Sequence, residues 1–169
     1  MTLVVPFDGS ELSEAALVRA AEFGVVFNEE VVAVTVVPKD DAGYARERGW
    51  LGPGESFDLS TVTARVEDTV RDLCPDADFR LEVAGRYASS GAIGNKLREM
   101  AVEERASMVF IGSETAGPLV TSVSSVGSTV AAEDFYDVVI VRHAQTARID
   151  KLRDAMPNSA DPPDFYRSE

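Results

Sequence analysis

Two short segments of the chain carry the residue types that bind phosphate groups in proteins. Segment 112–117 (GSETAG) follows an apolar run, and segment 127–129 (GST) precedes a helical pattern. Glycine lets the backbone approach a phosphate closely, and hydroxyl groups at a helix N-terminus donate hydrogen bonds to an anion. The same spacing also suits a flexible loop between strand and helix that ends in a serine cap and binds nothing. The candidate phosphate-binding residues are Gly112, Ser113, Gly117, Gly127, Ser128 and Thr129.

A carboxylate with a second possible role stands near the N-terminus. Asp8 directly follows the first apolar run and precedes Gly9 and Ser10. Its oxygens could accept hydrogen bonds from a ribose or a base. They could equally cap the helix that follows, because aspartate and serine are preferred at helix N-termini.

Nucleophilic and metal-binding residue types are scarce. The chain has one cysteine, Cys74, and one histidine, His143. Cys74 precedes Pro75 at a predicted helix end and is interpreted as an inert thiol, and His143 as a surface or interface histidine. We therefore predict no catalytic residue and no metal site formed by side chains, and a Ser-His-Asp hydrolase is disfavoured.

Strand-like and helical patterns alternate between these residues. Apolar, β-branched or alternating runs predict five strands, at 3–7, 31–37, 79–83, 108–111 and 138–141. Spacings of three and four predict helices that begin after Ser10 and near residues 62, 90 and 128. In the first helix, Gly24 is the predicted C-terminal stop. Its predicted core face consists of Leu12, Ala16, Ala20, Phe23 and Phe27.

This alternation predicts an α/β fold, a single doubly wound domain with helices on both faces of a five-stranded parallel sheet. We expect the strand order 3-2-1-4-5. Ligands bind such sheets beyond the carboxyl ends of the strands, where the strand order reverses. The crevice would then lie between strands 1 and 4, beside loops 6–10 and 112–128.

The predicted domain covers residues 1–145, with an insertion at 38–59 and a tail at 146–169. The insertion contains several glycines around Trp50 and shows no sustained period. It is interpreted either as a mobile cover over the site or as a packed surface loop. The tail contains three prolines, and we expect it to be mobile or ordered by a partner. Strand 138–141 is apolar although it would lie at a sheet edge, which favours a homodimer formed through it.

Charge excludes several classes of partner. The 169 residues include 29 acidic and 16 basic side chains, a formal charge of -13 that repels nucleic acid and anionic membranes. Lysine is rare against arginine, a composition that suits either a high-salt cytoplasm or an ordinary acidic protein. No apolar run is long enough to span a membrane and no basic leader is present, so we expect a cytoplasmic protein.

Four segments in order resemble the universal stress protein family. They are 4–11 (VVPFDGSE), 33–37 (AVTVV), 90–93 (SGAI) and 109–113 (VFIGS), and the resemblance spans residues 2–143. It implies an adenine-nucleotide-binding α/β protein, usually dimeric, that acts in stress responses and is not an efficient enzyme. The ligand would be ATP, AMP or another adenine nucleotide, with magnesium as a companion.

The resemblance also assigns roles to residues. Asp8 would contact the adenosine, and the backbone near Val36 would contact the adenine. The glycine and hydroxyl residues named in the first paragraph would surround the phosphates, and Pro6 belongs to the same binding set. Nucleotide-binding members carry Gly-x2-Gly-x9-Gly-Ser/Thr after strand 4. Here Thr115 replaces the second glycine, Gly117 lies two residues later, and Glu114 adds a carboxylate. A nucleotide-free structural or signalling dimer is therefore the alternative.

Two other α/β classes fit less well. An ATP pyrophosphatase needs a Ser-Gly-Gly-x-Asp-Ser loop after strand 1, which residues 6–10 do not supply. A phospho-receiver domain needs an acceptor aspartate after strand 3, where Ala84 and Gly85 stand.

Overall fold

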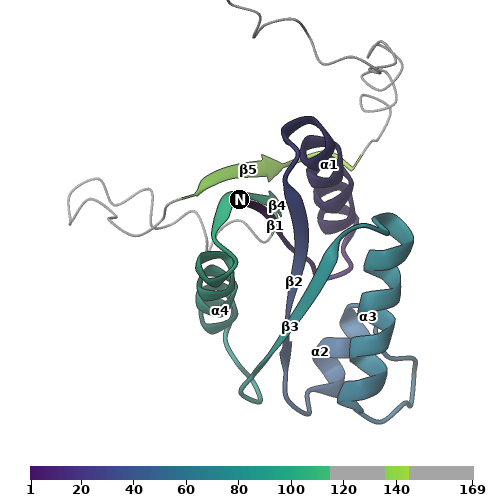
Figure 1. Cartoon of the computed structure of the whole chain (residues 1–169). Helices are drawn as coiled ribbons and strands as arrows, with labels where there is room; N and C mark the ends of the chain where they lie inside the picture. The colour runs from purple at the N-terminus through teal and green to yellow at the C-terminus, as the bar shows by residue number, and fades with distance from the viewer. Residues whose placement is uncertain (115–135, 145–169) are drawn as a thin grey trace, which may run out of the picture.

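Five parallel strands form one sheet in the order β3-β2-β1-β4-β5 (Figure 1). The computed structural model describes residues 1–114 and 136–144. The strands are β1 (Thr2–Pro6), β2 (Glu30–Pro38), β3 (Asp78–Ala84), β4 (Ala106–Gly112) and β5 (Asp137–Val141). The predicted fold class and strand order are confirmed.

Helices cover both faces of this sheet. They are α1 (Glu11–Phe27), α2 (Ala42–Glu47), α3 (Leu59–Leu73) and α4 (Ser90–Glu103). Figure 1 shows α1, α2 and α3 on one side of the strands and α4 on the other. The core is accordingly split in two, with Phe110 and the α1 and α3 side chains in one cluster and Ile111 and the α4 side chains in the other.

The position of each strand explains its sequence pattern. β2 lies inside the sheet, and all its residues from Val31 to Pro38 are buried, as expected for a strand covered on both faces. β3 lies at the edge beside β2, and most of its residues are partly or fully exposed. The alternation of apolar and charged residues at 79–83 therefore fits an edge strand, the position that the expected order 3-2-1-4-5 gave to this segment.

Helix α1 begins as predicted but does not end where predicted. The Ser10 hydroxyl accepts a hydrogen bond from the Ser13 amide at 3.2 Å and caps the helix. The helix continues past Gly24 to Phe27, and Asn28 ends it in the left-handed conformation. Gly24 instead allows close packing, because a Cβ there would lie 2.9 Å from the carbonyl oxygen of Glu29.

The predicted core face of α1 is also partly wrong. Ala16 and Ala20 are buried, but Phe23 and Phe27 are 37% and 50% exposed. The buried face instead continues through Ser13, Leu17 and Gly24. The burial of Ser13 is tolerated because its hydroxyl donates to the carbonyl of Ser10 at 2.9 Å.

The insertion at 38–59 is more ordered than its sequence pattern indicates. It contains helix α2, which is capped by Asp41, and its Trp50 and Leu51 side chains are only 5% and 4% exposed. Trp50 is thus anchored in the core rather than placed at a free hinge.

Several predictions fall outside the described residues. These are the helix near residue 128, the tail at 146–169, and the roles of Gly117, Gly127, Ser128 and Thr129.

Candidate functional site

A pocket of about 420 Å³ opens at the carboxyl edge of the sheet. It lies where the strand order reverses, with contributions from the ends of β1 and β2, from α2 and α4, and from the residues after β4. This is the position at which parallel α/β sheets bind ligands. Its lining residues are Pro6, Phe7, Asp8, Val36, Tyr44, Arg48, Ser90, Ile93, Gly94, Leu97 and Glu114.

The end of β1 places Asp8 at the pocket. The Oδ1 atom of Asp8 accepts a hydrogen bond from the Ser10 amide at 2.9 Å, and Gly9 between them has a φ of +80°. Such a turn fixes the carboxylate and favours glycine at its centre. Asp8 therefore shapes the turn into α1 and lines the pocket at the same time, so the two roles considered from the sequence are compatible.

A buried hydrogen bond across the sheet holds this turn in place. The Thr35 hydroxyl donates to the carbonyl of Phe7 at 2.8 Å, and the Phe7 amide donates to the carbonyl of Val34 at 2.8 Å. Thr35 is 1% exposed. Sequence reasoning did not single out Thr35, whose only local signal is a hydroxyl inside an otherwise apolar strand.

Helix α4 forms the wall on one side of the pocket. Its first turns present Ser90 and Gly94 with the apolar Ile93 and Leu97. The Ser89 hydroxyl caps the helix by accepting from the Ala92 amide at 3.2 Å. The helix N-terminus thus faces the pocket, and the partial positive charge of a helix N-terminus favours anions.

Helix α2 and the residue after it form the wall on the other side. The Arg48 guanidinium lies over the Tyr44 ring, with Cζ 3.4 Å from the ring centroid. Burial raises the pKa of Tyr44, Arg48 opposes that shift, and the charge of Asp8 adds to it. Sequence reasoning placed the insertion beside the site but named neither residue, because α2 has only six residues and is too short to show a helical period.

The start of the loop after β4 differs in part from the prediction. Glu114 lines the pocket, as the sequence argument assumed, whereas Gly112 and Ser113 are absent from the lining. A Cβ on Gly112 would lie 2.8 Å from the Cβ of Leu12, so this glycine permits the close approach of α1 to β4. The Ser113 amide donates to the carbonyl of Val141 at 2.9 Å.

Of the five predicted site residues that the structure describes, the pocket lining contains Pro6, Asp8 and Val36 but not Gly112 and Ser113. Residues 1–114 and 136–144 contain no group of three or more side chains that could hold a metal ion. In the same residues, no helix has the length and apolar character needed to span a membrane. Cys74 is buried, and its burial raises the pKa of the thiol, as expected for an inert cysteine.

Comparison with solved structures finds the same fold repeatedly. A universal stress protein in complex with cAMP is 23% identical, with a TM-score of 0.50 over 86% of this chain and 98% of that chain. The universal stress protein UspA from Lactobacillus plantarum is 18% identical, with a TM-score of 0.50 over 84% and 97% of the two chains. A universal stress protein from Archaeoglobus fulgidus in complex with dAMP is 16% identical, with a TM-score of 0.47 over 83% and 96%.

No curated protein matches the chain. The family described as the universal stress protein family matches residues 1–142, which include every described strand and helix and the whole pocket. The chain therefore belongs to the universal stress protein family.

Proposed function

We propose that this protein binds an adenine nucleotide in the pocket at the carboxyl edge of the sheet, and that it acts by binding rather than by turnover. The observation that carries the proposal is the convergence of Pro6, Asp8 and Val36 on one cavity of about 420 Å³. By resemblance alone, Asp8 and Val36 were assigned to the nucleoside and Pro6 to the same nucleotide-binding set, and they come from the end of β1 and from β2. The cAMP complex of the similar universal stress protein gives further support.

The residues present fit a nucleoside. Val36, Ile93 and Leu97 supply apolar surface for a purine. The second carboxylate oxygen of Asp8 and the Ser90 hydroxyl are polar groups that could bind a ribose. Any magnesium would arrive on the phosphates of the nucleotide, whose remaining contacts we assign to Gly117, Gly127, Ser128 and Thr129.

The alternative is a dimer of the same fold that no longer binds a nucleotide. Glu114 favours it, because a carboxylate near a triphosphate costs roughly 1 kcal/mol or more at an effective dielectric constant of about 20. The formal net charge of -13 also repels the triphosphate through long-range electrostatic interactions.

Mass spectrometry of the nucleotide released from the purified protein tests the proposal directly, and we expect an adenine nucleotide.

We also expect ATP-Mg to raise the melting temperature more in molar KCl than in 0.1 M KCl, because salt screens the net repulsion more than it weakens buried hydrogen bonds. Glu114→Arg should enlarge the shift at both salt concentrations. Glu103→Arg, at an exposed residue of α4 outside the pocket lining, is the control for the change in net charge.

An absence of released nucleotide, together with no thermal shift from ATP-Mg, AMP or cAMP in either the original protein or Glu114→Arg, would favour the nucleotide-free alternative. A shift that is largest at low salt would show that the repulsion from Glu114 has been overestimated.

A further inference from the structure

Arg48 stands out among the charged groups of the pocket. Within residues 1–114 and 136–144, the charged side chains of the lining are the carboxylates of Asp8 and Glu114 and the guanidinium of Arg48. Arg48 is therefore the one side chain of the described lining with a formal positive charge, and it stands against two carboxylates.

The hydrogen-bonding groups of Arg48 are largely unused. Its Nη1 atom donates to the carbonyl of Tyr44 at 3.5 Å, the upper limit for such a bond. Its Nε atom is buried and has no partner among the described residues. No described carboxylate lies within 4.0 Å of its guanidinium, whereas Arg65 has one such partner and Arg71 has two. Because each Nη atom of an arginine carries two donors in a planar fork, the Nη donors that the Tyr44 contact leaves unused remain available to a ligand.

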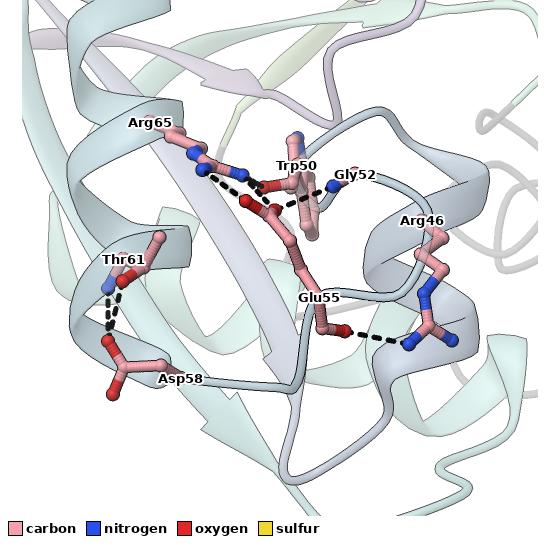
Figure 2. Close-up of polar contacts among 7 residues, drawn as sticks. All are labelled: Arg46, Trp50, Gly52, Glu55, Asp58, Thr61 and Arg65. Carbon is pink, nitrogen blue, oxygen red and sulfur yellow. Dashed lines mark hydrogen bonds and ion pairs between the residues drawn. The ribbon is translucent and has the colours of Figure 1, made fainter.

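The insertion holds this arginine in a fixed position. Stacking on Tyr44 restricts the guanidinium plane, and Tyr44 in turn packs at 5.8 Å from the buried Trp50 ring. Figure 2 shows the polar contacts behind Trp50: Arg65 donates to the Trp50 carbonyl at 2.9 Å and binds both carboxylate oxygens of Glu55. Arg46 donates to the Glu55 carbonyl at 2.7 Å, which connects α2 to the same contacts. The donor group is thus preorganised, which lowers the entropic cost of binding.

We propose that Arg48 binds the anionic group of the ligand and so makes the pocket selective for nucleotides over nucleosides. This inference rests on the proposed function, because it concerns the same ligand. The guanidinium edge donates hydrogen bonds to phosphate oxygens, and its charge offsets that of Asp8 and Glu114. Arginine is suited to this role because its fork matches the geometry of a phosphate.

Isothermal titration of adenosine, AMP and cAMP against the full chain and Arg48→Gln tests the inference. We expect the variant to bind AMP and cAMP roughly tenfold or more weakly, the usual size of a charge-assisted contact, and adenosine within about twofold of the original protein. Arg48→Lys keeps the charge without the planar fork and should recover part of the lost affinity.

Arg86→Gln is the matched control. Arg86 also lies over a tyrosine, Tyr87, with Cζ 5.1 Å from the ring centroid, but neither residue lines the pocket. This variant changes the net charge equally and should leave all three affinities unchanged. A circular dichroism melt of each variant reports whether the fold is retained.

The outcomes separate the inference from the proposed function. If Arg48→Gln leaves the affinity for AMP and cAMP unchanged, or weakens adenosine and AMP equally, the inference is overturned while nucleotide binding stands. An equal loss would mean that Arg48 stacks on the base or supports the pocket wall. If the original protein binds none of the three compounds although ATP-Mg raises its melting temperature, the inference is overturned while nucleotide binding stands. If neither the original protein nor Glu114→Arg responds to these compounds or to ATP-Mg, the proposed function fails, and the inference fails with it.

Discussion

At the scale of single residues, the Thr35 hydroxyl stabilises the end of β1, since it donates to the Phe7 carbonyl inside the protein. Thr35→Val keeps the shape of the side chain and leaves that buried carbonyl without this donor. We expect a loss of about 1 to 3 kcal/mol in the free energy of unfolding, measured by urea denaturation. Thr63→Val is the matched control, because the Thr63 hydroxyl donates to the Leu59 carbonyl at 2.7 Å on an exposed helix surface. An equal loss in both variants would contradict a special role for Thr35.

At the scale of elements, the insertion is tied to α3 through Glu55. The hydrogen bonds from Arg65 and from the Gly52 amide lower the pKa of the Glu55 carboxyl from 4.5 to about 2. A lowered pKa means that this contact stabilises the folded insertion above pH 4.5 and is lost as the pH falls toward 2. We expect Glu55→Gln to accelerate proteolytic cleavage within residues 48–58 at neutral pH and to remove the pH dependence of that cleavage.

Glu67→Gln is the control for the Glu55 contacts. Glu67 also pairs with an arginine of α3, Arg71, at 2.8 Å, but this ion pair lies within the helix and does not involve the insertion. Cleavage that is equally fast in both variants would show that the Glu55 contacts do not hold the insertion.

Because the same contacts support Trp50 and α2, Glu55→Gln should also weaken nucleotide binding, although less than Arg48→Gln.

At the scale of the whole molecule, β5 pairs with β4 on one side and ends the sheet on the other. Its Val138, Val139 and Ile140 are only partly buried. An apolar edge strand is a hazard that proteins usually cover, so we predict a homodimer formed through this strand. Light scattering at micromolar concentration should give twice the chain mass of 18.2 kDa. A mass near that of one chain would contradict the dimer and favour coverage of the edge by the tail at 146–169.

The sequence by itself determined the five strands, the starts of α1 and α4 and the strand order, but neither helix α2 nor the end of α1. Apolar runs of β-branched residues, the alternation at 79–83 and the serine caps are local patterns, and local backbone preferences act over a few residues. Right-handed connections then leave few ways to arrange five parallel strands, which is why the switch point beyond Asp8 could be predicted.

Only the tertiary structure decided what surrounds that switch point. Tyr44 of α2 and Arg48 directly after it reach the pocket from one face of the sheet, and α4 contributes Ile93 and Leu97 from the other. Gly112 serves the packing of α1 rather than the lining. These contacts join residues far apart in the chain, and their energy depends on burial and shape rather than on spacing. No sequence pattern within α2 could reveal its contacts with the pocket, because a helix of six residues is too short to show an amphipathic period. The helix is stabilised instead by the packing of Trp50 and Leu51 against the core.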